Sequence, residues 1–190
     1  MTKPERPEPP SLQKEINVAT SLYDMSVANY LQTVQAVAGL LNKSLAYCKE
    51  KGTEPTDIVE SRLFSDMLPF RFQIVSVAHH SLGAIEGLKS GVFSPPGQTG
   101  PLDYQGLQKL IDDTNVGLQK LTPSEVDALG GRGVVFKVGD RQVPFTAENF
   151  VLSFSLPNFY FHATTAYDIL RTKGVPLGKR DFLGQLRFTR

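Results

Sequence analysis

The chain has 190 residues, of which 41% are hydrophobic and 21% are charged, with a formal net charge of +1 at pH 7. This length suits one domain with a sizeable core. The 20 basic residues are scattered along the chain, which argues against nucleic-acid binding. Cys48 is the single cysteine, which excludes an internal disulfide or a cysteine-based zinc cluster and favours a reducing, cytoplasmic location.

Residues 1–20 are polar and rich in proline, and we expect a disordered leader there, because no apolar core of a signal peptide is present. The folded domain is then expected to span residues 21–190. Its first helix is predicted over residues 24–51, where apolar side chains recur at spacings of three and four. A capping box begins it at Ser21, and Gly52 ends it.

The second helix is predicted over residues 69–90, starting near Pro69. Its apolar face includes Phe72, Val75 and Leu82, and this face also contains His79. His80 follows about 100° around the helix. We therefore expect His79 to point inward and His80 to be a partly exposed neighbour.

A loop is expected over residues 91–100 and a third helix over residues 103–121. A second capping box at Thr122 predicts a short helix that stops before the glycines at 130 and 131. Residues 134–145 have strand character, with a turn at Gly139, and predict a small β-hairpin.

The fourth helix is predicted over residues 147–172, with a kink or break near Pro157. Residues 149–167 contain no charge, but their many polar side chains make a membrane span unsuitable. Residues 177–184 hold too few apolar side chains for another helix and are expected to pack back on the domain. The predicted fold is all-α: an antiparallel four-helix bundle with a small β-hairpin inserted before the last long helix.

Two polar side chains in the uncharged stretch are candidates for function. Asn158 and His162 are four residues apart, so they share one face of the fourth helix, and burial there would require partners. Asn158 has a structural alternative, because its amide could satisfy carbonyls left without a donor by Pro157. His162 is a candidate metal ligand or acid–base group, or a buried histidine that donates to a backbone carbonyl, to Asp24 or to Asp66.

Four motifs carry a resemblance to a known family: SLYD at residues 21–24, DMLP at 66–69 followed by Arg71 and Gln73, NFYFH at 158–162, and GVPLGKRDFLG at 174–184. Together they resemble an uncharacterised family of the DinB/YfiT-like superfamily of four-helix bundles. The resemblance extends over about residues 22–184. It implies the same bundle fold for this chain.

The resemblance also implies a possible site. Superfamily members bind a divalent ion through three histidines, one on helix two and two in an H-x-x-x-H motif on helix four, and some are thiol transferases. Here His162 matches the second histidine of that motif, Asn158 stands at the first, and His79 or His80 would supply the ligand from helix two. The implied metal set is His79, Asn158 and His162 for zinc, nickel or iron, with His162 also the catalytic candidate. Asparagine is a poorer zinc ligand than imidazole.

Three functional hypotheses remain open. The first is a site for a small molecule or divalent metal in the bundle core, inherited in altered form from metal-dependent thiol transferases. The second is a non-catalytic binding module that forms a homodimer through its helix faces and has lost the metal site. The third is an accessory enzyme, such as an isomerase or cyclase with a dry aromatic cavity, although no particular residue selects it.

Overall fold

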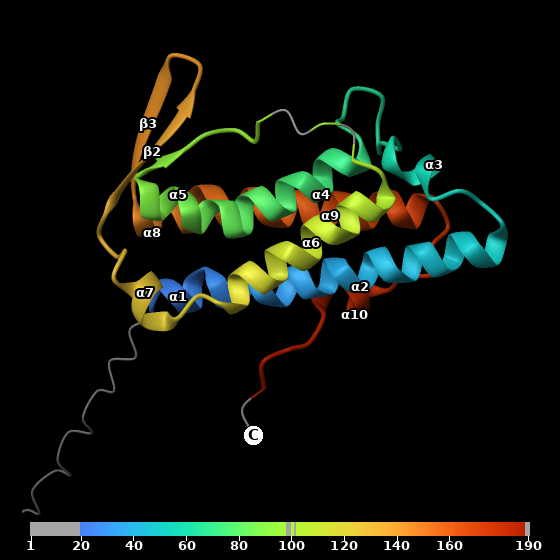
Figure 1. Ribbon diagram of the computed structural model, residues 1–190, viewed down its shortest axis with the longest axis horizontal. Coiled ribbons are helices and arrows are strands. Elements are labelled where there is room, and N and C mark those ends of the chain that lie inside the picture. The colour runs from blue at the N-terminus through green and yellow to red at the C-terminus, as the bar shows by residue number, and fades with distance from the viewer. Residues whose placement is uncertain (1–19, 98–99, 101, 189–190) are drawn as a thin grey trace, which may run out of the picture.

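The computed structural model describes residues 20–97, 100 and 102–188. The predicted leader lies outside this part except for its last residue, Thr20. The described chain is mostly helical and carries a small three-stranded sheet at one end, from which a hairpin projects (Figure 1). Among these residues, no helix is both long and apolar enough to cross a membrane.

The N-terminal helical stretch consists of α1 (Leu22–Met25) and α2 (Val27–Lys51). The hydroxyl of Ser21 accepts the N–H of Asp24 at 3.1 Å, which is one of the two bonds of the predicted capping box. Gly52 ends α2 with φ 66°, a left-handed conformation that glycine adopts without steric cost. A short helix, α3 (Thr56–Val59), follows before the chain turns back.

The next stretch, here called helix two, comprises α4 (Phe70–Ala78), η1 (His79–Gly83) and α5 (Ala84–Ser90). The middle segment is a π turn within an otherwise α-helical run. Helix two packs against α9 (Leu156–Thr172) on one side and α6 (Tyr104–Gln119) on the other. After α6, Thr122 and Glu125 form the predicted capping box of α7 (Pro123–Asp127).

The last long stretch, here called helix four, comprises α8 (Ala147–Phe150), η2 (Val151–Ser155) and α9 (Leu156–Thr172). It too contains a π turn, which ends two residues before Pro157. The sequence predicted a kink or break near Pro157. The structure instead has a change from π-helix to α-helix just before it, and the helical run continues. Proline fits at the start of α9 because the first turn of an α-helix does not need its N–H.

The sheet has three strands, β1 (Val92–Phe93), β2 (Gly133–Val138) and β3 (Arg141–Thr146). Strands β2 and β3 pair antiparallel across Gly139, where the hairpin was expected. Strand β1 pairs parallel with β2, in residues that the sequence assigned to a loop. Gly91 turns the chain at φ 77°, and its carbonyl accepts the Val135 N–H at 3.0 Å, which brings β1 against β2.

The C-terminal segment differs from its prediction. Residues 179–183 form a helix, α10 (Lys179–Leu183), where no helix was expected. The Asp181 carboxylate accepts the Gly178 N–H at 2.8 Å and pairs with Lys43 of α2, so local capping and one ion pair replace an apolar face. The segment does pack back on α2, since Gln32 Nε2 donates to the Leu183 carbonyl at 2.9 Å.

Candidate functional site

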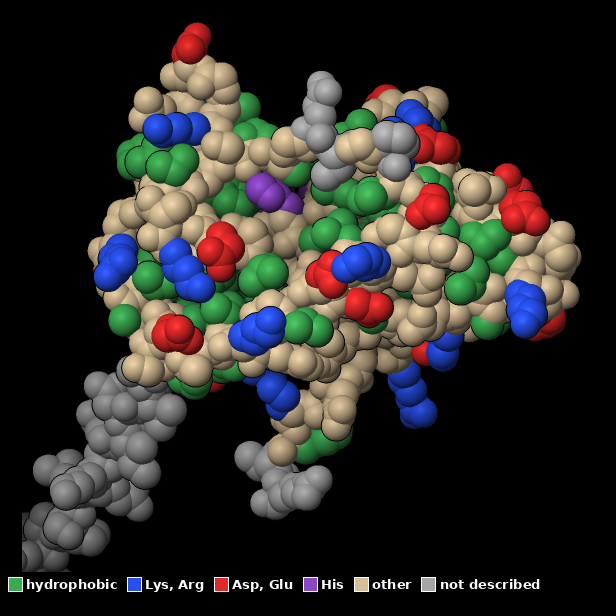
Figure 2. Space-filling view, viewed as in Figure 1, with side chains coloured by type: hydrophobic (Ala, Val, Ile, Leu, Met, Phe, Trp, Pro, Cys, Tyr) green, Lys and Arg blue, Asp and Glu red, His purple; other side chains and the backbone are tan. Residues whose placement is uncertain are grey.

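The three histidines of the chain lie together where helix two crosses helix four. The rings of His80 and His162 are nearly parallel, with 5.8 Å between their centroids and 17° between their planes. The His79 ring lies 5.4 Å from that of His80. On the face shown in Figure 2, histidine side chains reach the surface at one place, in a hollow among hydrophobic side chains.

The expected orientations of the first two histidines are wrong. His80 is 8% exposed and faces His162, whereas His79 is half-buried and faces β1. The reason is that helix two is covered on two sides, so its apolar residues do not mark a single inward face. In addition, the π turn starting at His79 changes the helical period at this point.

His79 is held by the strand and loop after helix two. Its ring stacks on Phe93 with centroids 4.4 Å apart. Its Nε2 lies 2.8 Å from the Ser94 carbonyl, which can only accept, so Nε2 carries the proton. Burial lowers the pKa of His79. These contacts give His79 a structural role beside the His80–His162 pair.

Gln73 fixes the protonation pattern of His162. The amide nitrogen of Gln73 donates to the Leu68 carbonyl at 2.8 Å, which leaves its oxygen, Oε1, to accept from His162 Nδ1 at 2.8 Å. Nδ1 of His162 therefore carries the proton, and Nε2 keeps a free lone pair. Gln73 is 2% exposed, so water does not compete for this contact.

His80 contains a buried polar atom without a partner. Its Nδ1 has no hydrogen bond to any described residue. Burial, and then the neighbouring His79 and His162, lower the pKa of His80 to about 3. Burial also lowers the pKa of His162 to about 4. Both imidazoles are thus neutral at pH 7, which is the form that binds metals.

Asn158 lies one helical turn before His162 and is half-buried. Its Nδ2 donates to the Phe154 carbonyl at 2.7 Å. Phe154 lies in the π turn that precedes Pro157. The carbonyl that an α-helical N–H at Pro157 would reach belongs to Ser153, so this bond is a local structural contact but does not satisfy the carbonyl that Pro157 leaves free. The side-chain oxygen of Asn158 is then the atom that would act as a ligand.

A buried hydroxyl chain connects three helices beside the histidine pair. Ser155 Oγ donates to the His80 carbonyl at 2.7 Å, and Tyr30 Oη lies 2.7 Å from Ser155 Oγ. Because Ser155 uses its one proton on the carbonyl, Tyr30 must donate to Ser155. Tyr30 and Ser155 are both 0% exposed.

The side chains around the pair are aromatic. Phe93 and Phe154 lie 5.5 and 5.7 Å from the His80 ring, between centroids. Phe161 and Phe72 lie 5.3 and 5.8 Å from the His162 ring. Phe161 is 57% exposed and carries this apolar lining to the protein surface.

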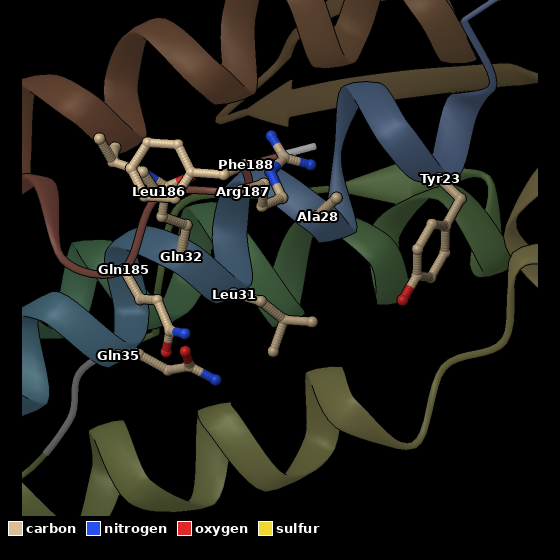
Figure 3. A pocket seen from close by; sticks show the side chains of 9 residues that line it. All are labelled: Tyr23, Ala28, Leu31, Gln32, Gln35, Gln185, Leu186, Arg187 and Phe188. Atoms are coloured by element: carbon tan, nitrogen blue, oxygen red, sulfur yellow. The ribbon is translucent and has the colours of Figure 1, made fainter. Parts of the chain in front are cut away.

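Two hollows lie apart from the pair. One, of about 410 Å³, runs between helix two and α6 on the side of His79. Another, of about 510 Å³, lies between α2 and residues 185–188. Figure 3 shows Gln35 and Gln185 at one end of the second hollow and Tyr23 at the other. Among the described residues, its lining contains no histidine, cysteine or carboxylate side chain.

Within the described ranges, no group of three or more histidine, cysteine, aspartate or glutamate side chains is placed to hold a metal. The structure brings His80 and His162 together from two helices and sets Asn158 one turn away. Sequence reasoning missed Gln73, Ser155 and Tyr30 as partners. One signal was available: Gln73 precedes His80 by seven residues and Ser155 precedes His162 by seven, which places each polar pair on one helix face.

Comparison with known proteins identifies the family. Residues 22–183 match the family model described as Domain of unknown function (DUF1993), and the chain belongs to this family. It is also similar to the crystal structure of a DinB family member protein from Shewanella denitrificans, with 22% sequence identity and a TM-score of 0.75. That match covers 89% of this chain and 95% of the other, and it shows a DinB-like fold. No curated protein matches the chain.

Proposed function

We propose that this DinB-like protein binds a divalent metal ion at the His80–His162 pair and presents it to a small apolar molecule. The observation that carries the proposal is the buried Nδ1 of His80, which has no hydrogen-bond partner in the described part of the chain and belongs to a ring beside a second neutral imidazole. A ring nitrogen buried without a partner costs free energy, and in the tautomer with the proton on Nε2 its lone pair would be satisfied by a cation.

The side chains fit a metal in part. His162 has the arrangement typical of a metal-binding histidine, because one ring nitrogen donates to a fixed acceptor, Gln73, and the other is free. Two imidazoles and the amide oxygen of Asn158 make a weaker set than three histidines. We therefore propose the ligand set His80, Asn158 and His162, with water completing the coordination. In this set His80 replaces the expected His79.

The chemistry follows from neutral imidazoles in an aromatic surrounding. A general base works best with a pKa near the working pH, and the pKa of His162, about 4, lies well below neutrality. His162 is therefore better suited to hold an ion or a ligand than to remove a proton. A divalent ion bound there would favour the deprotonated form of a bound water or thiol.

The surrounding phenylalanines favour an apolar partner for the ion. Phe72, Phe154 and Phe161 come from both helices and place only ring surface near the two histidines. A molecule with an apolar body and one thiol or oxygen donor would bury that body against the rings. A strongly charged molecule would lose its hydration there without gaining an ion pair from these side chains.

The test is calorimetric titration of the purified, metal-free protein with Ni²⁺ and Zn²⁺, followed by thermal unfolding with each ion. We expect binding and a raised melting temperature in the wild type. His80→Gln and His162→Gln should abolish both effects. His79→Gln is the matched control, since it changes the adjacent histidine, and it should bind as the wild type does.

Two results would remove the proposal. One is a wild type that binds neither ion, and the other is loss of binding in His79→Gln with binding retained in His80→Gln. The second result would assign the ligand on helix two to His79, as the sequence suggested.

A binding module is the second candidate, and exposed apolar side chains on helix four favour it. Leu152, Tyr160 and Phe161 are 50%, 39% and 57% exposed. Apolar side chains left in water on one helix are a common feature of association surfaces. Light scattering after size exclusion, with the wild type and Phe161→Ser, tests it: a dimer lost in the variant supports the module, and a monomeric wild type rejects a homodimer.

A further inference from the structure

The two helices that carry the histidine pair are joined by two hydrogen bonds, one on each side of it. Gln73 of helix two bonds to His162 of helix four, and Ser155 of helix four bonds to the carbonyl of His80 in helix two. The helices run antiparallel, and seven residues separate the two bonds along each helix. This spacing is two helical turns, roughly 10 Å.

The bond from Ser155 joins the two π turns. The His80 carbonyl lies in η1, and Ser155 is the last residue of η2. π turns interrupt the regular α-helical hydrogen bonding and occur frequently at functional sites. Here a hydroxyl from one π turn holds the backbone of the other, at the residue whose ring faces His162.

Tyr30 completes this arrangement from α2. Its ring packs on Phe159 at 5.1 Å between centroids, a contact that phenylalanine could make equally well. Its hydroxyl group donates to Ser155, which frees the Ser155 proton for the His80 carbonyl. The tyrosine oxygen is therefore explained by the bond at His80 rather than by packing of the core.

We propose that Tyr30 and Ser155 are positioning residues, which hold the backbone of His80 so that its ring stays opposite His162. This inference rests on the proposed function in one respect: if the pair binds a metal, the two hydroxyl groups set the affinity. Groups that orient metal ligands typically change affinity by roughly 10–100-fold when removed. We expect a loss in that range for Tyr30→Phe and for Ser155→Ala.

The fold supplies a matched control. Tyr104 of α6 and Ser44 of α2 form a second buried tyrosine–serine pair, and Tyr104 Oη also donates to the Leu41 carbonyl at 2.9 Å. Both side chains are buried, at 3% and 0% exposure, and neither contacts a histidine in a ring pair or hydrogen bond described above. Tyr104→Phe and Ser44→Ala therefore remove the same atoms without touching His80.

The experiment measures two quantities for the wild type and these four variants. The first is the dissociation constant for Ni²⁺ by calorimetry. The second is the ¹⁵N chemical shifts of the ring nitrogens of His80 and His162 in the metal-free protein. Tyr30→Phe removes one oxygen and keeps the ring, so it serves as the test if Ser155→Ala does not fold.

The expected result is weaker Ni²⁺ binding and changed His80 ring shifts in Tyr30→Phe and Ser155→Ala, with both quantities unchanged in Tyr104→Phe and Ser44→Ala. Unchanged ring shifts in folded Tyr30→Phe would overturn the positioning role. Equal changes in the control variants would overturn it too, because they would show a general loss of stability. If the wild type binds no Ni²⁺ but the His80 shifts still move in Tyr30→Phe, the proposed function fails and the positioning role stands.

Discussion

At the scale of single residues, the arrangement around His162 is decided by the direction of one amide. Gln73 donates to the Leu68 carbonyl, so its oxygen must face His162 and must accept. This order of donors and acceptors leaves His162 with one free nitrogen directed away from Gln73. An amide side chain can donate one hydrogen bond and accept another at the same time, whereas a purely apolar side chain can do neither.

Gln73→Met tests the contact. Methionine has a similar length, but it would leave the His162 N–H and the Leu68 carbonyl without this partner, which typically costs about 1–3 kcal/mol in a buried site. We expect that loss in the free energy of urea unfolding, together with a change in the His162 ring ¹⁵N shifts. Gln35→Met is the control, since Gln35 is exposed and its 3.4 Å contact with Asn115 is weak.

The sequence predicted part of this residue-level arrangement. The spacing of Asn158 and His162 placed both on one face of helix four, where they lie. The sequence indicated a backbone carbonyl, Asp24 or Asp66 as the partner of a buried His162, whereas the structure shows Gln73. A hydrogen bond between residues 89 positions apart depends on how two helices align, and helical periodicity contains no information on that alignment.

At the scale of elements, the structure contains two π turns and a strand, β1, that the sequence did not predict. Each π turn lies within a run that the sequence correctly indicates as helical, but local propensity does not distinguish π from α. Strand β1 is two residues long, too short for a period-2 pattern. Helix α10 forms through Asp181, whose capping bond and ion pair compensate for the few apolar side chains that argued against a helix.

Gly87 marks the close packing of helix two on β1. A Cβ at this position would lie 2.9 Å from Cδ2 and 3.1 Å from Cβ of Phe93, a ring that is 3% exposed. Gly87→Ala should therefore lower the free energy of unfolding by about 1–3 kcal/mol, as overpacking does in well-packed cores. It should also move the NMR signals of His79, which stacks on Phe93.

Gly39→Ala is the matched substitution in α2. A Cβ there meets nothing within 4 Å, so the higher helix propensity of alanine should raise the free energy of unfolding by up to about 1 kcal/mol. Chemical denaturation of Gly87→Ala and Gly39→Ala measures the free energy of unfolding of each variant and tests both expectations. Stabilisation by Gly87→Ala would show that Phe93 can move freely, contrary to the packing described here.

At the scale of the whole molecule, the histidines make stability depend on pH. The pKa of His80 is lowered to about 3 and that of His162 to about 4 by burial, against 6.5 for a free imidazole. Between 6.5 and those values the unfolded chain binds protons that the folded chain does not. Stability is therefore complete above pH 6.5 and falls as the pH falls, by up to about 1.4 kcal/mol per pH unit for each histidine.

Urea unfolding of the metal-free protein between about pH 7.5 and pH 5 measures this dependence. We expect a smaller slope in His80→Gln, because the variant lacks one of the three histidines whose pKa burial lowers. Most carboxylates titrate below this range, so the difference between the two curves isolates the histidine. Equal slopes in the wild type and the variant would show that His80 is protonated as readily in the folded chain as in the unfolded one.

The family and the mostly helical, DinB-like fold were predictable from the sequence, because they depend on patterns that extend over nearly the whole chain. Helix lengths, caps and turns follow from local chemistry at residues such as Thr122 and Gly52. The sequence did not determine whether His79 or His80 faces helix four, because both sides of helix two are covered. The answer depends on which element packs against each side.

The bonds that assemble the histidine pair connect parts of the chain that are synthesised far apart. Tyr30 and Ser155 are 125 positions apart, and Ser155 and His80 are 75 apart. Contacts of this kind form late, since the intervening chain must first lose its freedom. On the ribosome, a nascent chain ending before helix four lacks both Ser155 and His162, so the histidine pair is assembled only when translation is nearly complete.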